Sequence, residues 1–193
     1  MADKKKLEAA LEKKALYGED IDLSKYDDND EARTKSTGDL TAGGKSKLAK
    51  VGIELDGEGR SATFIQVDNA PVQVEVEKDT PLELMNTGDA AKKHPELVEK
   101  YWWKAVAPDT DKYTAKTATE REQGYFIRVR AGHKISAPLQ ACVFIGHEDQ
   151  LQRVHNVVII EEGAELNIIS GCASDPSVGN GVHLAPSAVF VAI

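Results

Sequence analysis

The residues best suited to chemistry in this sequence are two cysteines and two histidines in its C-terminal third. Cys142 and Cys172 lie 30 residues apart, and His155 and His183 lie on either side of Cys172. A cysteine thiolate is a nucleophile and a ligand for soft metals, and a neutral imidazole is a common metal ligand. Neither cysteine belongs to a CxxC pair, so the spacing predicts neither a disulfide framework nor a zinc site.

The local context of these four residues leads to different expectations. Cys142 stands in the apolar run LQACVFI, which predicts a buried packing side chain. Cys172 stands in ISGCAS, and both a packing role and a chemical role stay open for it. His155 and His183 could supply imidazole ligands, although a hydrogen-bonded structural role is the alternative for His183. The remaining histidines have the context of caps and polar turns: His94, His133 and His147. The sequence does not identify a metal.

Two other motifs are not expected to bind ligands. The residues GGKS at 43–46 are similar to the end of a phosphate-binding loop, but that loop requires a glycine where Asp39 stands and an apolar strand before it. We therefore expect no nucleotide site. The acidic run DDNDE at 27–31 lacks the glycine and the final glutamate of a calcium loop, so we expect a solvated segment there.

Composition excludes several classes of protein. The 193 residues carry a net charge of −8, which argues against a nucleic-acid ligand and against docking on anionic membranes. No apolar run reaches the length of about 18 residues that a membrane-spanning helix needs, so no membrane insertion is expected. The N-terminal segment has no apolar stretch typical of a secretory signal, so we expect a cytoplasmic protein with reduced thiols.

The first quarter of the chain is predicted to position little of this chemistry. Residues 3–17 predict a helix, because apolar side chains recur on one face opposite lysines and glutamates, and Asp3 can cap its start. The polar and acidic composition from 18 to 47 predicts a linker or a loosely held arm. Residues 1–47 are thus expected to be a helix followed by a polar acidic linker.

The rest of the chain, 48–193, is predicted to be rich in β-strands. Apolar and polar residues alternate in three early segments, which predicts strands at 51–55, 61–67 and 71–77. A helix is expected near 89–104, with Pro95 in its first turn and with Trp102 and Trp103 as packing residues, one of which could face a partner. Strands are expected to resume after a polar stretch and to continue almost to the end.

An internal repeat is the most informative feature of the β-rich region. The segment 126–135 matches the segment 157–166 at an offset of 31 residues, with a glycine at the same place in each copy, Gly132 and Gly163. A glycine there fits a turn with positive φ. Strand–turn units at a fixed period favour stacked coils, as in a β-helix or solenoid, and a meander of hairpins is the alternative. The strands are apolar on both faces, which favours the stacked arrangement.

Four segments resemble one known family. They are EKKALYGEDIDLSKY (12–26), EKYWWKAVAPDTDKYTA (99–115), GYFIRVRAGHKISAPLQACVFI (124–145) and HNVVIIEEGAELNIISGCAS (155–174). Together and in this order they resemble the SufB/SufD family of iron–sulfur cluster assembly scaffolds, in particular the N-terminal half of its short archaeal-type members. The resemblance implies a right-handed parallel β-helix. We therefore predict a mainly β fold, a truncated β-helix with an N-terminal helical arm.

The resemblance also implies a function. Members of the family are scaffold subunits and not enzymes, and they work with a SufC-type ABC ATPase and a SufB/SufD-type partner. A transient iron–sulfur cluster shared with a partner is the only cofactor that it implies. Cys172 matches a Gly-Cys signature of the family that is associated with sulfur acceptance. His183 aligns with a histidine common in the family, and His155 and Cys142 are further candidate ligands.

This sequence departs from the family in length, since family members are about twice as long. It is expected to be either a fragment or a shortened homologue, and the open end of its coils predicts self-association. Two alternatives stay open. The chain could be an interaction module or shortened regulator of a full-length family member, or an enzyme with a cupin-like or carbohydrate-active fold. Few acids are predicted to point inward, and the histidines lack cupin-like spacing. The choice between a SufB-like and a SufD-like role is not determined.

Overall fold

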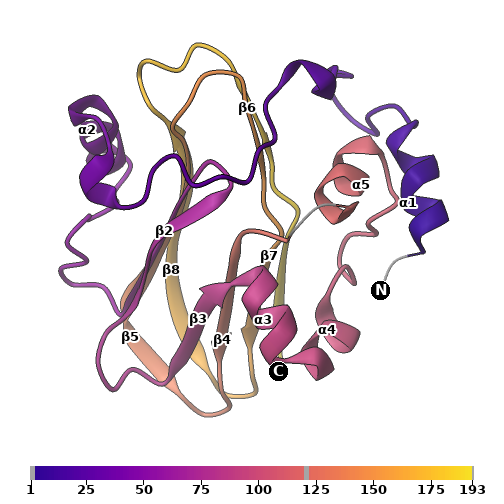
Figure 1. The fold of residues 1–193 in the computed structure, drawn as a ribbon. Coiled ribbons are helices and arrows are strands. Elements are labelled where there is room, and N and C mark those ends of the chain that lie inside the picture. The colour runs from indigo at the N-terminus through magenta and orange to yellow at the C-terminus, as the bar shows by residue number, and fades with distance from the viewer. Residues whose placement is uncertain (1–2, 120–121, 193) are drawn as a thin grey trace.

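The computed structural model describes residues 3–119 and 122–192, which form three β-sheets flanked by helices (Figure 1). The helices of this described part are α1 (Lys4–Leu11), α2 (Ala42–Lys50), α3 (Thr87–Lys93), α4 (Pro95–Tyr101) and α5 (Lys112–Thr119), with 3-10 turns at Leu23–Lys25 and Thr37–Asp39. The strands are β1 (Ala62–Val67), β2 (Ala70–Val76), β3 (Leu82–Asn86), β4 (Tyr125–Val129), β5 (Lys134–Ile145), β6 (Gln150–Arg153), β7 (Asn156–Ile160), β8 (Glu165–Ser174), β9 (Gly181–Leu184) and β10 (Ser187–Val191). Within these ranges every helix is too short and too polar to cross a bilayer.

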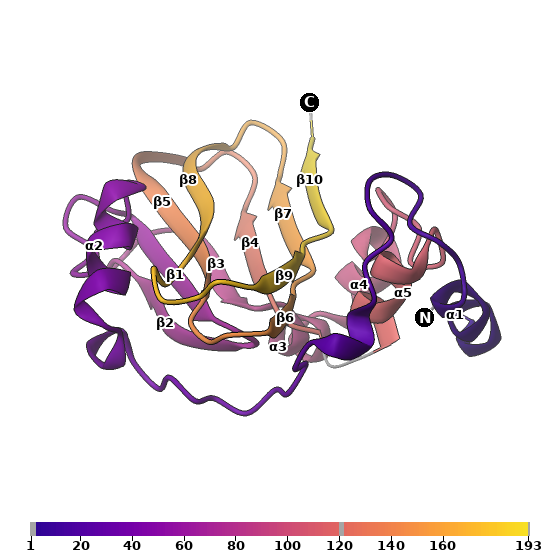
Figure 2. The same cartoon turned by 90° about the horizontal axis from the view of Figure 1, so that it is seen from above.

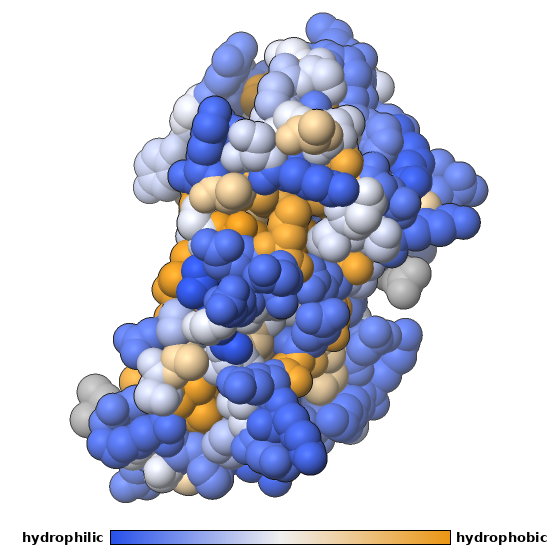
Figure 3. All heavy atoms as spheres, turned by 90° about the vertical axis from the view of Figure 1, so that its left-hand side faces the viewer, coloured by the Kyte–Doolittle hydropathy of each residue, from blue (hydrophilic) through white to orange (hydrophobic). Residues whose placement is uncertain are grey.

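The strands are arranged in two larger sheets and one small one. One sheet has the order β2-β1-β5-β8, another the order β10-β7-β4-β3, and the third pairs β6 with β9. Helices α3, α4, α5 and α1 gather on one side of the sheets, and α2 lies at the opposite side (Figure 2). The surface on the α2 side is mainly hydrophilic, with separate apolar patches (Figure 3).

The expected right-handed parallel β-helix is not the fold of this chain, and that prediction is wrong. Both larger sheets are mixed, because β1 pairs antiparallel with β2 and β3 pairs antiparallel with β4, and the sheets do not close into a solenoid. The antiparallel pairing of β1 with β2 has a local cause. Val67 pairs with Ala70, so only Asp68 and Asn69 form the turn, and Asp68 has φ of 52°. A two-residue connection of this kind joins antiparallel strands.

The offset of 31 residues is confirmed as the register of the parallel pairs. Phe126 lies opposite Val157 in β4 and β7, and Val157 in turn lies opposite Ala188 in β10. The segment 187–191 is therefore a third copy, which the sequence comparison missed. Gly132 and Gly163 have φ of 76° and 68°, as the turn at the end of each copy requires.

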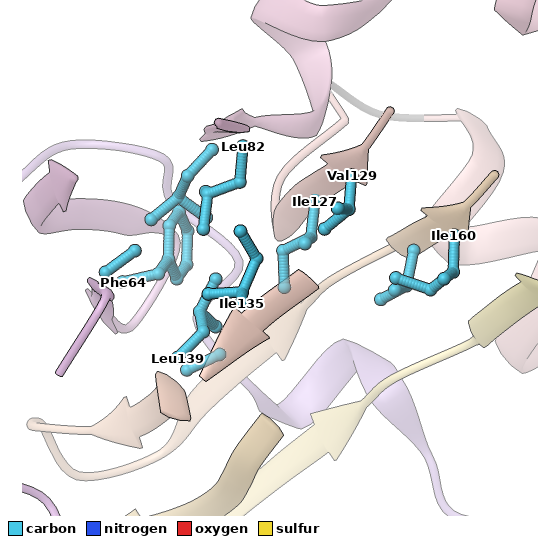
Figure 4. Close-up of a cluster of buried hydrophobic side chains, with 11 residues drawn as sticks. Phe64, Leu82, Ile127, Val129, Ile135, Leu139 and Ile160 are labelled. Carbon is cyan, nitrogen blue, oxygen red and sulfur yellow. The ribbon is translucent and has the colours of Figure 1, made fainter. Parts of the chain in front are cut away.

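The main hydrophobic core lies between the two larger sheets (Figure 4). Its eleven buried residues are Ala62, Phe64, Leu82, Leu84, Ile127, Val129, Ile135, Leu139, Ala141, Val158 and Ile160. A second cluster lies on the outer face of the first sheet, where Leu48 of α2 packs near Cys142 and Phe144 of β5. The strand β5 is thus covered on both faces, which explains its long apolar run.

The predicted helices are only partly correct. The first helix begins after Asp3, whose side chain accepts a hydrogen bond from the amide of Lys5, but it ends at Leu11 and not near residue 17. The predicted helix near 89–104 is two helices, and Pro95 is the first residue of α4, as expected. The expected strand at 51–55 does not form, and α5 lies in a stretch that was read as polar connection.

The segment 18–47 is expected to be a linker or loosely held arm, but its part before α2 is bonded to β6. Asp27 forms a β-bridge with Gln150. Arg153 is only 2% exposed, and its Nη2 atom donates to Oδ1 of Asp30 at 2.9 Å. A buried guanidinium needs such partners because an unpaired buried charge is strongly unfavourable. Acidic residues of this segment thus pair with the buried Arg153 of β6 and also with Lys112 and Lys116 of α5.

Candidate functional site

Cys172 lies on β8, at the outer edge of the first sheet. It pairs with Val143 of β5 on one side, and β8 has no neighbouring strand on its other side within the described chain. Side chains alternate between the two faces of a strand, so Cys172 shares its face with Ser170, which lies opposite the core residue Ala141. Cys172 thus stands on the inner face of the sheet and is still exposed to solvent.

Cys142 has the opposite environment. It lies opposite Gly171, one position along the strand from the pair that contains Cys172, so the two thiols are on opposite faces of the sheet. Cys142 is fully buried in the cluster beneath α2. Burial, with a smaller contribution from Cys172, raises the pKa of Cys142 to about 12. Since the thiolate is the reactive form, the buried Cys142 is suited to packing, and Cys172 is the thiol that solvent can reach.

His183 lies on β9 opposite Gln152, and both side chains are on the same face of the small sheet. The Nε2 atom of Gln152 donates to the carbonyls of Phe144 and Asp68, at 3.0 and 2.7 Å. This face of the small sheet therefore points toward the C-terminal end of β5. The Nδ1 atom of His183 is buried and has no hydrogen-bond partner within the described chain. Burial lowers the pKa of His183, so its imidazole is neutral near neutral pH.

Cys172 and His183 belong to one layer of the molecule, which we call the end layer. It consists of one outer strand from each sheet: β8, β9 and β10. Val189 and Val191 of β10 lie opposite the core residues Val158 and Ile160, yet 63% and 61% of their surface is exposed. The end layer therefore contains an exposed thiol, a neutral imidazole with a buried Nδ1 atom, and two exposed valines that continue the rows of core residues.

The two other candidate ligands are not in the end layer. Cys142 lies beneath α2, as described above. His155 is buried on the side of the α3–α5 helices, where its ring stacks on Trp103 at 4.1 Å between ring centroids. No three His, Cys, Asp or Glu side chains in residues 3–119 and 122–192 are grouped so as to hold a metal ion. Cys172 and His183 are the cysteine and the histidine of the end layer.

Sequence reasoning missed the apolar part of this site. Val189 and Val191 were not singled out, because the repeat was recognised in two copies only. Adding 31 to the core positions Val158 and Ile160 gives both valines, so the signal was present in the repeat.

Comparison with known proteins identifies the class. An iron–sulfur cluster assembly SufBD family protein of Methanothermobacter thermautotrophicus (strain Delta H) is 41% identical over 194 aligned residues, which cover 97% of this chain and 47% of the relative. A protein of the same family from Archaeoglobus fulgidus is 42% identical over 147 residues, covering 76% of this chain and 39% of the relative. The iron–sulfur cluster assembly protein SufB of Bacillus subtilis is 28% identical over 106 residues, 55% of this chain. No protein-family model matches the chain.

The chain belongs to the SufBD family of iron–sulfur cluster assembly proteins. It spans about half of the length of these relatives or less. The family resemblance of the four sequence segments is thereby confirmed.

Proposed function

We propose that this chain is a scaffold component of iron–sulfur cluster assembly and that it accepts sulfur on Cys172. The observation that carries the proposal is the contrast between the two cysteines. In a chain whose relatives are named for cluster assembly, one thiol is buried with a pKa of about 12, and the other is exposed in the end layer. A sulfur acceptor must meet its donor directly, so the exposed thiol is the one that can serve.

The proposed step is the transfer of one sulfur atom from a protein persulfide. The Cys172 thiolate attacks the outer sulfur of the donor persulfide, a new S–S bond forms on Cys172, and the S–S bond of the donor breaks. The donor cysteine leaves as a thiolate and takes up a proton, so no external oxidant or reductant is needed. The neutral imidazole of His183 is in the same layer and is assigned as a proton acceptor or a ligand for the cargo.

The family and the small number of cluster ligands in this chain support a function together with partner proteins. We propose a SufC-type ABC ATPase and a SufB/SufD-type subunit as partners in the cytoplasm, with the iron–sulfur cluster as cargo and no catalytic role for this chain alone. An iron–sulfur cluster is commonly held by four ligands. The end layer contains one cysteine and one histidine, Cys172 and His183, so a partner would supply further cysteine or histidine ligands.

A sulfur-transfer assay tests the proposal. A cysteine desulfurase loaded from ³⁵S-cysteine is mixed with the chain, and protein-bound label is measured on non-reducing gels. We expect label on the wild type that a reducing agent removes, no label on Cys172→Ser, and full label on Cys142→Ser if circular dichroism shows that this variant is folded. Equal labelling of wild type and Cys172→Ser would show that Cys172 is not the acceptor.

A role as an interaction module is the second candidate, and the unpaired outer strands of the end layer favour it. Such edges accept a strand from a partner. Size-exclusion chromatography with the full-length archaeal relative would show a complex under this hypothesis, even with Cys172→Ser. Loss of the complex in that variant would instead connect binding to the thiol.

A further inference from the structure

A pocket of about 510 Å³ lies among the helices at one side of the sheets. Its walls come from Leu7 of α1, the C-terminal end of α4 and Ala118 of α5. These helices stand together at one side of the sheets (Figures 1 and 2). A volume of this size is in the range of about 300–1,000 Å³ that is typical of small-ligand sites. Most of the lining is apolar or aromatic: Leu7, Val98, Trp102, Trp103, Pro108 and Ala118.

The inner wall of the pocket carries a carboxylate that stays ionised. Glu122 accepts hydrogen bonds from the indole nitrogens of Trp102 and Trp103, at 2.7 and 3.4 Å, one on each oxygen. Burial favours a higher pKa for Glu122, but His155 and the two indoles outweigh it and lower the pKa below its usual value. Each carboxylate oxygen has a second lone pair, so Glu122 can accept a further donor from the pocket.

The backbone at Trp103 is held in an unfavourable conformation at this place. Trp103 has φ of 55°, in the left-handed region that a bulky side chain rarely adopts. One face of its ring stacks on His155, which is 2% exposed and whose Nδ1 atom lies 3.8 Å from Glu122 with no hydrogen-bond partner in the described chain. Strained residues persist where surrounding contacts hold them, and they concentrate at ligand sites.

We propose that this pocket binds an organic cation, an ammonium or guanidinium group attached to an apolar or aromatic body. The apolar body would lie against Leu7, Val98 and the indoles, and the cationic group would reach Glu122.

The charges around the pocket favour a cation. Glu99 and Lys104 both line the rim, both are exposed, and their charges are opposite. Among the described lining residues the third charged side chain is Glu122, which is negative and largely shielded from solvent, where it acts most strongly on a ligand. The indole faces add to the attraction, because the face of an aromatic ring carries negative potential. An anion would meet the same carboxylate with repulsion.

The two tryptophans make the test direct, because Trp102 and Trp103 are the only tryptophans of the sequence. Their fluorescence therefore reports on this pocket alone. The full chain is titrated with benzylamine, a cation at neutral pH, and separately with uncharged benzyl alcohol and with anionic benzoate. We expect a saturable change with benzylamine and binding weaker by roughly tenfold or more for the other two, since one ion pair in a shielded site is worth about 1.4 kcal/mol or more.

Two variants separate binding in the pocket from other effects. Ala118→Phe fills the pocket and is expected to abolish the change, with circular dichroism showing that it is folded. Glu122→Gln is expected to weaken benzylamine by roughly tenfold and to leave benzyl alcohol unaffected. A peptide with one lysine between leucines, compared with its norleucine analogue, distinguishes a polypeptide source from a free small molecule. Equal affinities for benzylamine and benzyl alcohol, or undiminished binding to folded Ala118→Phe, would overturn the proposal.

Discussion

At the scale of single residues, the two cysteines differ in solvent access and in the pKa of their thiols. Cys142 is buried with a pKa raised to about 12, and Cys172 is exposed. We expect iodoacetamide at mildly alkaline pH to modify Cys172 alone in the native protein, because alkylation needs an accessible thiolate. Mass spectrometry should show one adduct in the native state and two after unfolding in guanidinium. Native modification of Cys142 would contradict its placement beneath α2.

Glu83 is a carboxylate whose pKa is lowered by its basic neighbours. Its carboxylate is 15% exposed and is bonded to His94, Lys93 and Arg130, with Nε2 of His94 at 2.9 Å. Burial favours a higher pKa, but these bonds outweigh it and lower the pKa of Glu83 from 4.5 to about 2. A carboxylate whose pKa is lower in the folded than in the unfolded protein stabilises the fold at pH values above its unfolded pKa. This contribution, at most about 3 kcal/mol, is therefore complete above pH 4.5 and is lost as pH falls toward about 2.

Glu83→Gln tests this linkage. We expect the variant to be less stable than the wild type at neutral pH and the difference to shrink as pH falls from about 4.5 to about 2. Urea unfolding at a series of pH values measures it. Glu162→Gln serves as the control, since Glu162 is an exposed carboxylate in a neighbouring turn. A difference that stays constant with pH would show that Glu83 acts through packing and not through its charge.

At the scale of elements, helix α2 explains the two glycines of the GGKS segment. A Cβ atom on Gly44 would lie 2.8 Å from Oδ2 of Asp175 and 3.3 Å from Phe144, whereas one on Gly43 would make ordinary contacts with Pro176. The hydroxyl of Thr41, which caps α2, is also bonded to Asp175. Gly44 therefore allows a close approach of helix and sheet, whereas Gly43 has room for a Cβ atom. The motif that resembled a phosphate loop thus has a structural use at Gly44.

Matched alanine variants test this reading of α2. Alanine is favoured over glycine in a helix by up to about 1 kcal/mol, so we expect Gly43→Ala to be neutral or slightly stabilising. Gly44→Ala should lower the free energy of unfolding by about 1–3 kcal/mol, because the helix must move off Asp175 and Phe144. Chemical denaturation measures both. Equal stability of the two variants would show that α2 is not held closely against β5.

The elements that sequence reasoning found are those with strong local signals. Pro95 begins α4, Gly132 and Gly163 form positive-φ turns, and the offset of 31 is the register of the parallel strands. Most of α2, residues 42–47, falls in the segment that the polar composition predicts to be a linker, whereas α2 is stabilised by one buried leucine and by contact with the sheet. A short helix of this kind depends on tertiary packing, which composition does not report.

At the scale of the whole molecule, sequence reasoning failed where pairing is decided by contacts between distant segments. The repeat indicated parallel neighbouring strands. It did not indicate that β2 pairs antiparallel with β1, or β3 with β4, at the other edge of each larger sheet. The acidic segment before α2 has the composition of a solvated arm. Its attachment to the sheet depends on Arg153, which is only 2% exposed and is bonded to this segment. For the candidate site, the sequence named Cys172 and His183, but their position in outer strands required the topology.

The end layer leads to a prediction about assembly. Outer strands with unpaired backbone groups and exposed apolar side chains are prone to pair with another chain. Val189, 63% exposed, lies on the inner face of β10 above the core, whereas Val51 is 40% exposed after α2, on the mainly hydrophilic side of the molecule (Figure 3). We therefore expect the mass measured by light scattering to rise with protein concentration, and Val189→Lys to reduce that rise while Val51→Lys leaves it unchanged. If the wild type stays monomeric at high concentration, or if both lysine variants behave alike, the outer strands do not drive association.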